Sequence, residues 1–513
     1  MKKFIKVLLL TLMFASMYAR RGVGNFDGRT FFTVRPPFNQ VMPEKISLFR
    51  YDRMIPDNCY WGGALQAVVF GGQSINCDQI AEYFLPAGKT SLNVVEFKPG
   101  VATADGDPAK DVEARNFNIQ TQSVDTTFRS RISFCPQQTM FGIGFTYYQA
   151  LTYKYDGNVK FWLGISAPVV RVENTMGFCE TVLSNGDGAV DELGLDNSPR
   201  VGNMTQAFKQ SNWKYGRIVK GCKNVKWGLS DIELYVGYNT INEDHCWLNS
   251  YFGLVLPTGN RPKARIVFEP IVGNNHHFGI FLGNNLGFKI LEKGPHKLSY
   301  ILDSDSRLLF RNHQRRSFDL IDKQWSRYME TYANKGAAIA AVDASAAGDF
   351  VFADNSGTSG INVFTSCFKV KPRFLFNINS AIRYDHCEDW ALEVGYNFFA
   401  RQAESVELCW NPDSALKSVN GLGFTNIAKT IKNNFTDCDI PLADYAPIEK
   451  NEIDLDSAAH PGVLSNIIYL TIGYNSTCHD RPIFAAVGGS YEFASINTTL
   501  DRWLIWFKAG ISF

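Results

Sequence analysis

Long stretches of alternating apolar and polar residues are the most constraining feature of this chain. Within 390–401, for instance, Trp390, Leu392 and Val394 are separated by more polar or smaller residues. Successive residues of a β-strand point to opposite faces of the sheet, so a period of two indicates strands with one apolar and one polar face. The same alternation recurs in 128–134, 298–311 and 373–384.

The alternating stretches are longer than the strands of most soluble proteins. Strands in soluble domains average about five or six residues, whereas several of these stretches run for about ten to fourteen. A transmembrane β-strand needs about nine to eleven residues. A soluble β-sandwich would also alternate, but the length of the stretches favours a barrel that spans a membrane.

Fourteen segments are candidate strands, of which 112–121 has the weakest pattern. It is included because a single-chain bacterial barrel normally has an even number of strands, with short turns at the end that carries both termini and long loops at the other. The sequence therefore predicts an all-β fold: one antiparallel up-and-down barrel of about 14 strands, within a range of 12 to 16. The strands are expected at 59–71, 112–121, 126–136, 140–153, 159–170, 225–239, 246–256, 277–291, 296–311, 373–384, 388–402, 463–475, 482–494 and 502–513.

Four long links, about 171–222, 257–275, 312–364 and 405–460, are expected to be extracellular loops that hold short helices. One of them contains a helical period, in which Phe318, Ile321, Trp325 and Tyr328 recur every three or four residues. This spacing predicts an amphipathic helix over 317–333.

Composition and charge agree with a membrane barrel. The chain has 39 Phe, 21 Tyr and 10 Trp beside 42 Gly, a mixture that suits lipid-facing strands, aromatic girdles and tight turns. Lys and Arg total 51 against 50 Asp and Glu, so no excess of positive charge points to nucleic acid as a partner.

The first nineteen residues have the features of a secretory signal peptide. Three lysines within the first six residues precede an apolar centre at 7–14, and Ala19 is a small residue suited to cleavage. After it there is no run of eighteen uncharged apolar residues, so helical membrane spans are not expected. Three regions follow: a cleaved signal peptide at 1–19, an N-terminal periplasmic or lumenal segment at 20–58, and a transmembrane barrel at 59–513, located in the outer membrane.

Residues that could carry out chemistry are not gathered in any recognisable motif. The His276–His277 pair has no serine nearby and lies at the start of an expected strand, and no phosphate-binding or dinucleotide-binding loop is present. The eleven cysteines are scattered, with no CxxC pair and no readable disulfide spacing. We therefore expect no enzyme activity, no catalytic residues, no metal and no cofactor.

The last strand has a special pattern. Counting back from Phe513, every second residue is apolar, and the other face holds Ser512, Gly510, Lys508 and Arg502. This strand resembles the terminal strand of Gram-negative outer-membrane β-barrel proteins, a porin-like class. The resemblance implies that the barrel-assembly machinery recognises the strand and that outer-membrane lipid surrounds the barrel. The expected assembly signal is Trp503, Ile505, Phe507, Ile511 and Phe513.

If the apolar residues face lipid, the charged residues of the same strands face the lumen. An unpaired Lys or Arg facing lipid at the bilayer midplane would cost about 2–4 kcal/mol. Charged groups of both signs inside a barrel can filter solutes, or can pair with one another and fill a closed interior. The expected lumen-lining residues are Arg129, Arg131, Asp231, Glu233, Asp303, Asp305, Arg307, Arg311, Arg373, Arg383, Glu393 and Arg401.

Three functions fit this sequence. The first is an outer-membrane channel for passive diffusion of small hydrophilic solutes, made anion-selective by Arg307, Arg311, Arg373 and Arg383 on two neighbouring strands. The second is a transporter of hydrophobic compounds, whose phenylalanine-rich segment before the first strand would form a hatch. The third is a structural or adhesive surface barrel. The oligomeric state is open.

Overall fold

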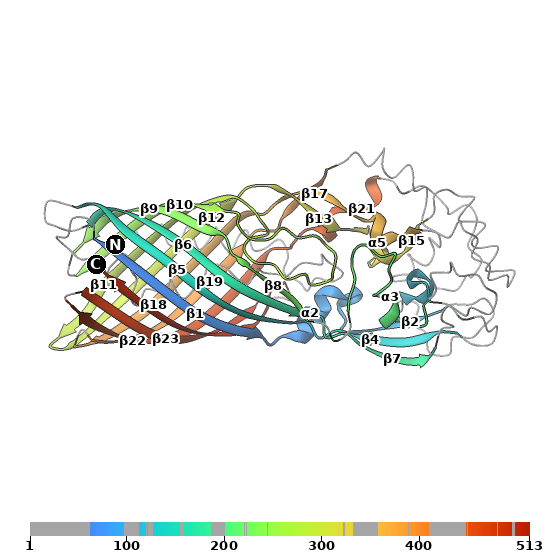
Figure 1. Cartoon of the computed structure of the whole chain (residues 1–513), viewed down its shortest axis with the longest axis horizontal. Helices are drawn as coiled ribbons and strands as arrows, with labels where there is room; N and C mark the ends of the chain where they lie inside the picture. Colours follow the sequence, from blue (N-terminus) through green and yellow to red (C-terminus); the bar gives the residue numbers. More distant parts are fainter. Residues whose placement is uncertain are drawn as a thin grey trace.

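In a computed structural model of the chain, twelve of the alternating segments pair edge to edge in one closed antiparallel barrel (Figure 1). Neighbours around the barrel are also neighbours in sequence, and the first strand closes the ring by pairing with the last. The structure describes residues 62–96, 112–119, 121, 127–153, 159–185, 201–219, 221, 223–243, 245–321, 324–331, 358–387, 389–409, 448, 450–479, 481–494 and 498–513. The barrel strands are β1 (Gly63–Ser74), β5 (Gln137–Tyr153), β6 (Val159–Thr175), β9 (Ile232–Asn242), β10 (Cys246–Leu256), β11 (Gly279–Lys293), β12 (His296–Leu309), β18 (Arg373–His386), β19 (Trp390–Arg401), β22 (Val463–Cys478), β23 (Arg481–Ala494) and β24 (Arg502–Ser512).

The expected count of fourteen is too high by two strands. Segment 112–121 contains only the two-residue strand β3 (Val112–Glu113) and a 3₁₀ turn, η4 (Ala114–Phe117). Segment 126–136 forms the short strand β4 (Arg129–Ser133) of a separate sheet. Because two consecutive expected strands are absent from the barrel, the number of barrel strands is still even and the strands still follow an up-and-down order. A thirteenth strand, β8 (Asn224–Leu229), adds to one edge of β6.

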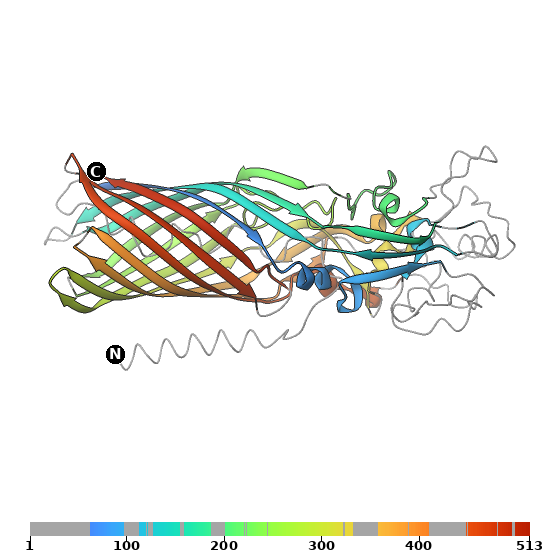
Figure 2. The same cartoon turned by 90° about the horizontal axis from the view of Figure 1, so that it is seen from below.

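The barrel has two different ends. Short turns link β5 to β6, β9 to β10, β11 to β12, β18 to β19 and β22 to β23, and the C-terminus lies at the same end, which we call the turn end. The long links, including the four expected ones, all leave the other end, which we call the loop end (Figure 2).

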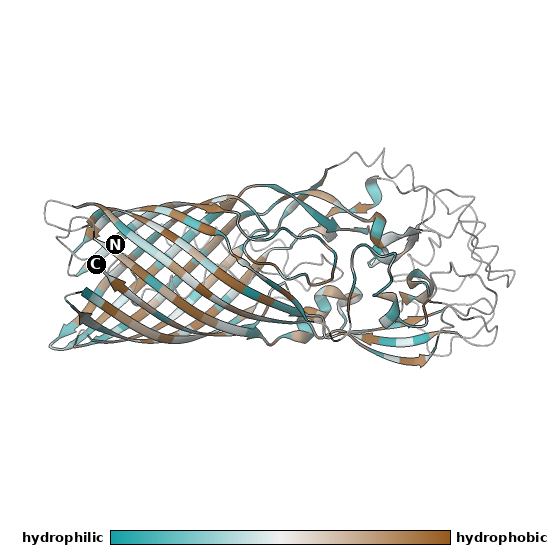
Figure 3. Cartoon of the chain, in the orientation of Figure 1, coloured by the Kyte–Doolittle hydropathy of each residue, from teal (hydrophilic) through white to brown (hydrophobic). Residues whose placement is uncertain are grey.

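Hydrophobic and hydrophilic residues alternate along the barrel strands (Figure 3), and the large apolar side chains that are exposed form an apolar band on the outward face. Leucine, isoleucine and valine side chains such as Leu282 and Ile505 are about 60% exposed there. Aromatic rings pair on this face near the turn end, as Trp390 with Tyr474 and Phe288 with Tyr300, and near the loop end, as Phe278 with Phe310. This is the surface that a transmembrane barrel presents to lipid, with aromatic girdles at both interfaces. No helix in the described part of the chain is long and apolar enough to cross a membrane.

Beyond the loop end the long links fold together into a cap with its own hydrophobic cores. One core draws on five loops that are far apart in sequence, from Ile80 to Leu500, and a second contains Phe318, Phe364 and Phe368. A disulfide, Cys77–Cys135, ties the first helix to the start of β5. The cap elements are α2 (Cys77–Phe84), η3 (Pro86–Gly88), β2 (Ser91–Val95), β7 (Cys179–Ser184), α3 (Met204–Ala207), β13 (Asn312–Ser317), β14 (Asp319–Leu320), η6 (Ser326–Tyr328), β15 (Glu330–Thr331), β16 (Thr358–Ser359), α5 (Gly360–Val363), β17 (Thr365–Lys371), β20 (Ser405–Leu408), η9 (Lys450–Glu452), β21 (Ile453–Asp454) and η10 (Leu455–Ala458), with β3, β4 and η4.

The amphipathic helix expected over 317–333 is not formed in the described residues of that segment. They fold instead as β13, β14, η6 and β15. Phe318 packs in the second core, whereas Trp325 and Tyr328 pack in the first, so the apolar residues do not share one face. Asp319 and Arg327 form a buried ion pair of 2.6 Å between them, which a helix with one polar, solvent-facing side would not bury.

Candidate channel interior

Large aromatic residues on the inward face of the barrel lie against glycines of the neighbouring strand. In the register of the sheet, each of these rings is directly paired with a glycine, and a Cβ on that glycine would lie within about 2.5 Å of the ring. A neighbouring strand can therefore accept the ring only where the residue has no side chain. The pairs are Phe70–Gly142, Trp162–Gly237, Tyr235–Gly164, Trp247–Gly287, Tyr251–Gly283, Phe281–Gly253, Tyr469–Gly395, Phe484–Gly510 and Trp506–Gly488.

A buried charge network crosses the inner wall from β12 to β9. The Arg307 guanidinium donates to Asp305 Oδ1 at 2.7 Å and to Glu233 Oε1 at 2.5 Å, and it lies 4.9 Å from the ring centroid of Phe281. Arg307 is 2% exposed. Because the two carboxylates neutralise it, the strongest inward cation on β12 contributes no net positive field of its own.

Other inward polar groups also pair with one another. Arg502 on β24 donates to Glu492 Oε2 at 2.7 Å, and Arg383 on β18 bonds to Asp385 at 2.6 Å. The Tyr469 hydroxyl donates to Glu393 at 2.6 Å. Interior carboxylates thus lie on β9, β12, β19 and β23, and the basic residues Arg502 and Lys508 lie on β24.

A second buried network, which we call the neck cluster, lies at the junction of barrel and cap. It consists of His277, Gln314, Arg316, Glu404 and His460. Arg316 Nη1 lies 2.9 Å from Glu404 Oε2, and the His460 backbone N–H donates to the same carboxylate at 3.0 Å. Gln314 bonds to both Arg316 and His277 Nε2.

The electrostatics of the neck cluster favour one charge state. Burial is the largest influence on Glu404 and opposes its ionisation, but the positive charges of Arg316 and Arg401 and the hydrogen bond from the His460 backbone together outweigh it and hold the pKa of this carboxyl well below its usual range. Burial lowers the pKa of His277 to about 4. A neutral imidazole there can donate from Nδ1 to the Phe310 carbonyl, 2.8 Å away, and accept from Gln314 at Nε2.

The structure divides the expected lumen-lining residues into three groups. Glu233, Asp303, Asp305, Arg307, Arg383 and Glu393 lie on the inward face of barrel strands. Asp231 is buried just before β9, and its carboxylate accepts hydrogen bonds from the Gly259 backbone and from both the backbone and the side chain of Asn274. Arg401 is the last residue of β19, at the loop end. The remaining four are Arg129, Arg131, Arg311 and Arg373.

Two of those four lie in the cap and two lie exposed at the loop end of the barrel. Arg129 and Arg131 lie on β4, in the cap sheet, where their face of the strand points away from the cap core. Arg311 is exposed between β12 and β13, and Arg373 is exposed at the first residue of β18. The expected cluster of four arginines is also not one cluster, because Arg383 pairs with Ser299, eight residues before Arg307 on β12, which places the two about 25 Å apart along the strand.

The residues of the expected assembly signal all lie on the outward face of β24. Trp503, Ile505, Phe507 and Phe513 are 40–59% exposed, and Ile511 is partly exposed. Phe513 also extends the pairing of β24 with β1, because its backbone N–H and C=O both bond to Gly63, at 2.9 and 2.7 Å. Recognition of this strand by an assembly machinery stays a prediction.

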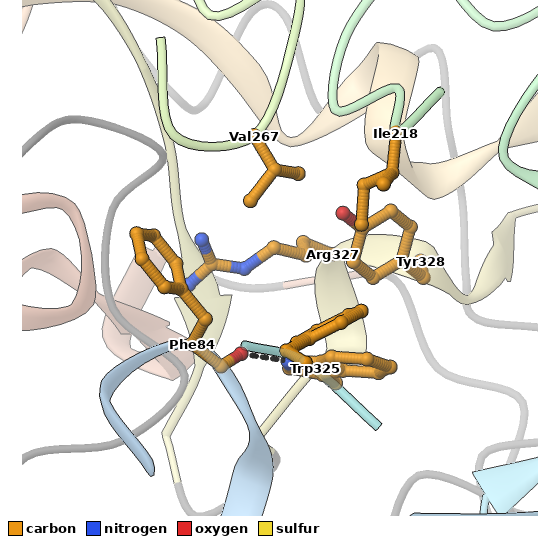
Figure 4. A pocket seen from close by; sticks show the side chains of 7 residues that line it. Phe84, Ile218, Val267, Trp325, Arg327 and Tyr328 are labelled. Carbon is orange, nitrogen blue, oxygen red and sulfur yellow. Dashed lines mark hydrogen bonds between the residues drawn. The ribbon is translucent and has the colours of Figure 1, made fainter. Parts of the chain in front are cut away.

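A small cavity lies inside the cap, lined by Phe84, Trp325, Tyr328 and other residues of the first core (Figure 4). It has space for about one water molecule. The Trp325 indole N–H donates to the Phe84 carbonyl at 2.9 Å. The side chains that line the cavity leave no room for a solute.

Sequence reasoning missed the neck cluster and Lys508, Arg502 and Glu492 as interior residues. The last three could have been found, because Arg502 and Lys508 share the polar face of the final strand and Glu492 shares the face of Ser490 and Gly488. The neck cluster lies in long links without periodicity, so no local pattern marks it. Three pairs of adjacent histidine and cysteine lie at separate turns, namely His245–Cys246, His386–Cys387 and Cys478–His479. No group of three or more His, Cys, Asp or Glu that could hold a metal occurs in the described residues.

No protein-family model matches the sequence, and no curated protein matches it. Among solved structures, the fold is similar to the COG4313 outer membrane channel from Pseudomonas putida F1, with 9% identity, a TM-score of 0.38, and 92% of this chain and 100% of that chain covered. It is also similar to a Pseudomonas aeruginosa FadL homologue, with 7% identity, a TM-score of 0.29 and coverage of 90% and 96%. The NanC porin matches with 8% identity, a TM-score of 0.23 and coverage of 74% and 93%.

Proposed function

We propose that this protein is an outer-membrane channel for passive diffusion of small hydrophilic solutes. The observation that carries the proposal is the contrast between the two faces of one closed barrel. The outward face is an apolar band with aromatic margins, whereas the inward face holds ionised and amide side chains on many strands. Charged groups that line a barrel favour water and polar solutes over lipid-like ones.

In this proposal the turn end faces the periplasm and the cap faces the cell surface. Short turns at the end with the C-terminus and long loops at the other are the arrangement of bacterial outer-membrane barrels. Export by the signal peptide at 1–19 belongs to the same proposal, and those residues lie outside the described part of the chain.

The glycine–aromatic pairs form the inner wall of the proposed channel. Each ring covers a glycine of the adjacent strand, so its bulk lies along the wall instead of reaching straight across the interior. The inner wall thereby combines rigid aromatic surface with charged groups between the rings.

A second candidate is a transporter of hydrophobic compounds. The observation that favours it is the aromatic cluster of Tyr148, Trp162, Tyr235, Tyr251 and Phe281 on the inward face of β5, β6, β9, β10 and β11. Such a cluster could accept an apolar solute. The N-terminal segment that was expected to act as a hatch lies outside the described residues.

Conductance of the purified full-length protein in a planar bilayer tests the proposal. A hydrophilic channel should give discrete steps that increase with salt concentration, and liposomes that contain it should swell in a small sugar. Silent bilayers together with uptake of a fluorescent fatty acid into vesicles would favour the second candidate. Silent bilayers without uptake would reject both.

A further inference from the structure

A group of polar side chains interrupts the apolar band on its outward face. Ser250 on β10, Asn284 on β11 and Ser304 on β12 are directly paired neighbours in the register of the three strands. Ser306, two residues further along β12, shares their face. We call these four residues the polar patch.

The polar patch lies in the middle of the band and not at its margin. On β12 it falls between Tyr300 and Phe310, which belong to the aromatic margins at the two ends. On β11 the outward residues on either side of Asn284 are Leu282 and Leu286. If the barrel crosses the membrane as proposed above, the polar patch faces the hydrocarbon core.

Asn284 is incompletely satisfied at this position. Its side-chain oxygen accepts from the Ser250 hydroxyl at 2.7 Å, and no described residue accepts from its amide NH₂ group. Other outward polar groups pair locally, such as Tyr396 with Asn466 at 2.6 Å and Tyr300 with Ser380 at 2.9 Å. Lipid tails offer no acceptor, so an exposed amide in the hydrocarbon core is costly and favours association with another protein surface.

We propose that the polar patch is the centre of an interface with a second copy of this chain. A carboxamide both donates and accepts, so two Asn284 side chains can bond to each other across a two-fold axis parallel to the barrel axes. An isologous contact of this kind needs one self-complementary surface and no other partner. Leu282, Leu286, Leu302 and Leu308 surround the patch and provide apolar packing against the same residues of the other copy. The proposal rests on the membrane location in the proposed function.

Energy transfer between labelled copies in lipid vesicles tests this interface. Donor-labelled and acceptor-labelled full-length protein is reconstituted at decreasing protein-to-lipid ratios. The wild type should retain transfer at dilutions where random proximity gives none. Asn284→Leu should weaken association at least tenfold, because it replaces the amide with a side chain that lipid solvates, whereas Asn284→Gln should retain part of it.

The matched control is Val69→Leu on β1, which faces outward across the barrel from β12. It should associate like the wild type. A wild type without transfer beyond random proximity, or Asn284→Leu with undiminished transfer in folded protein, would overturn the interface. Conductance is not part of this assay, so a failure of the channel function and a failure of the interface are distinguishable.

A separate observation concerns two cap cysteines, Cys367 on β17 and Cys409 directly after β20. Phe368 pairs with Leu408, so Cys367 and Cys409 are the next pair in the register, and the Cys409 backbone N–H donates to the Cys367 carbonyl at 3.1 Å. The Cα atoms of such a hydrogen-bonded antiparallel pair are about 5.5 Å apart, within the range of disulfides. The two Sγ atoms are 2.6 Å apart, closer than two unbonded sulfur atoms approach.

We infer that Cys367 and Cys409 form a disulfide in the exported protein. The two thiols would lose two protons and two electrons, and a thiol–disulfide oxidoreductase would take the electrons as its own disulfide is reduced to a dithiol. The bond would link the β12–β18 loop to the β19–β22 loop, and so fix two loops of the cap to each other.

Peptide mapping after alkylation without reduction tests this bond. A peptide pair joined through Cys367 and Cys409, lighter by two hydrogens than the two separate peptides, is expected, while exposed Cys179 and Cys387 should be alkylated. Cys367→Ser should free Cys409 for alkylation, and Cys409→Ser should free Cys367. Alkylation of both cysteines in the denatured, unreduced wild type would refute the disulfide.

Discussion

The indole of Trp162 lies over Gly237, its directly paired neighbour on the next strand, so closely that a Cβ on Gly237 would be 1.9 Å from the ring. The indole N–H donates to Asn239, two residues further along the same strand, at 2.8 Å. One strand therefore provides both the space and the hydrogen-bond acceptor for a ring from the other.

Gly237→Ala should destabilise the barrel, because the new methyl group and the Trp162 ring cannot occupy the same space. We expect a loss of about 1–3 kcal/mol, measured as a lower urea midpoint in lipid vesicles. Gly71→Ala on the outward face is the control, since the nearest atom to its Cβ would be 3.6 Å away. Equal midpoints for the two variants would mean that the close approach carries no cost.

Arg307→Ser should shift the channel toward cation preference. The change leaves Asp305 and Glu233 without their shared cation, and their field would attract cations within the roughly 8–10 Å over which salt screens it. The reversal potential under a salt gradient measures the shift. Arg307→Lys should remain near the wild type, as should Arg311→Ser at the exposed site. If Arg307→Ser folds and conducts with an unchanged reversal potential, the network does not face the conduction path.

Native cysteines test the orientation of the barrel. Cys179 is exposed in the cap, whereas Cys387 and Cys478 are exposed in turns at the opposite end. An impermeant maleimide applied to intact cells should modify Cys179 and spare the two turn cysteines, which should react only after the membrane is opened. Labelling of intact cells should be lost in Cys179→Ser, which would identify Cys179 as the labelled residue. The reverse labelling order would invert the barrel.

Deletion of Phe513 should reduce membrane insertion without blocking export. The residue forms two backbone bonds to Gly63 at the end of the β1–β24 pairing, and its aromatic ring lies 6.5 Å from that of Tyr147. The deleted protein should appear in the periplasm or be degraded, as immunoblots of cell fractions would show. Phe513→Tyr, which keeps the ring and the backbone, should insert normally; membrane levels unchanged by the deletion would count against the assembly signal.

Acid should weaken the neck cluster through His277. Its pKa is about 4 in the folded protein and about 6.5 in the unfolded chain, so the folded state disfavours the proton. The stability that the neutral ring contributes is complete above pH 6.5 and is lost as the pH falls toward 4. Burial raises the pKa of Asp231 to about 6, which acts in the opposite direction over part of this range. The measurement is therefore the difference in urea midpoint between the wild type and His277→Gln, which should shrink between pH 6.5 and 4; a constant difference would exclude this role.

The barrel could be predicted from the sequence because each barrel strand is marked by alternation within its own short segment. Alternation and length together identified the twelve barrel strands, and only their edges and one break, between β8 and β9, were misplaced. Segment 126–136 shows why the same pattern failed in the cap. Phe128, Ile132 and Phe134 do share one buried face, but that face meets the cap core, and Arg131 on the other face is exposed. Alternation reports two different environments and does not say that one of them is lipid.

The charge partners could not be predicted in the same way. Arg307 and Glu233 are 74 residues apart, on strands separated by two others, and only the closed ring brings them together. Gln314 and His277 in the neck cluster meet across two long links with no periodicity. The face on which a residue lies follows from its odd or even position along the strand. Contacts between strands that are not neighbours depend instead on the curvature of the whole barrel.

The first core of the cap contains residues of five loops, from Ile80 after the first strand to Leu500 just before the last. No single loop contains the whole of this core. Since β24 follows Leu500 and also closes the ring, the cap can be completed only when the barrel is nearly finished. If the cap faces the cell surface as proposed, the loops must cross the membrane as open chain, and their collapse on the far side would make the crossing difficult to reverse. Folding of the cap would in this sense be the last step of assembly and would oppose reversal of the earlier steps.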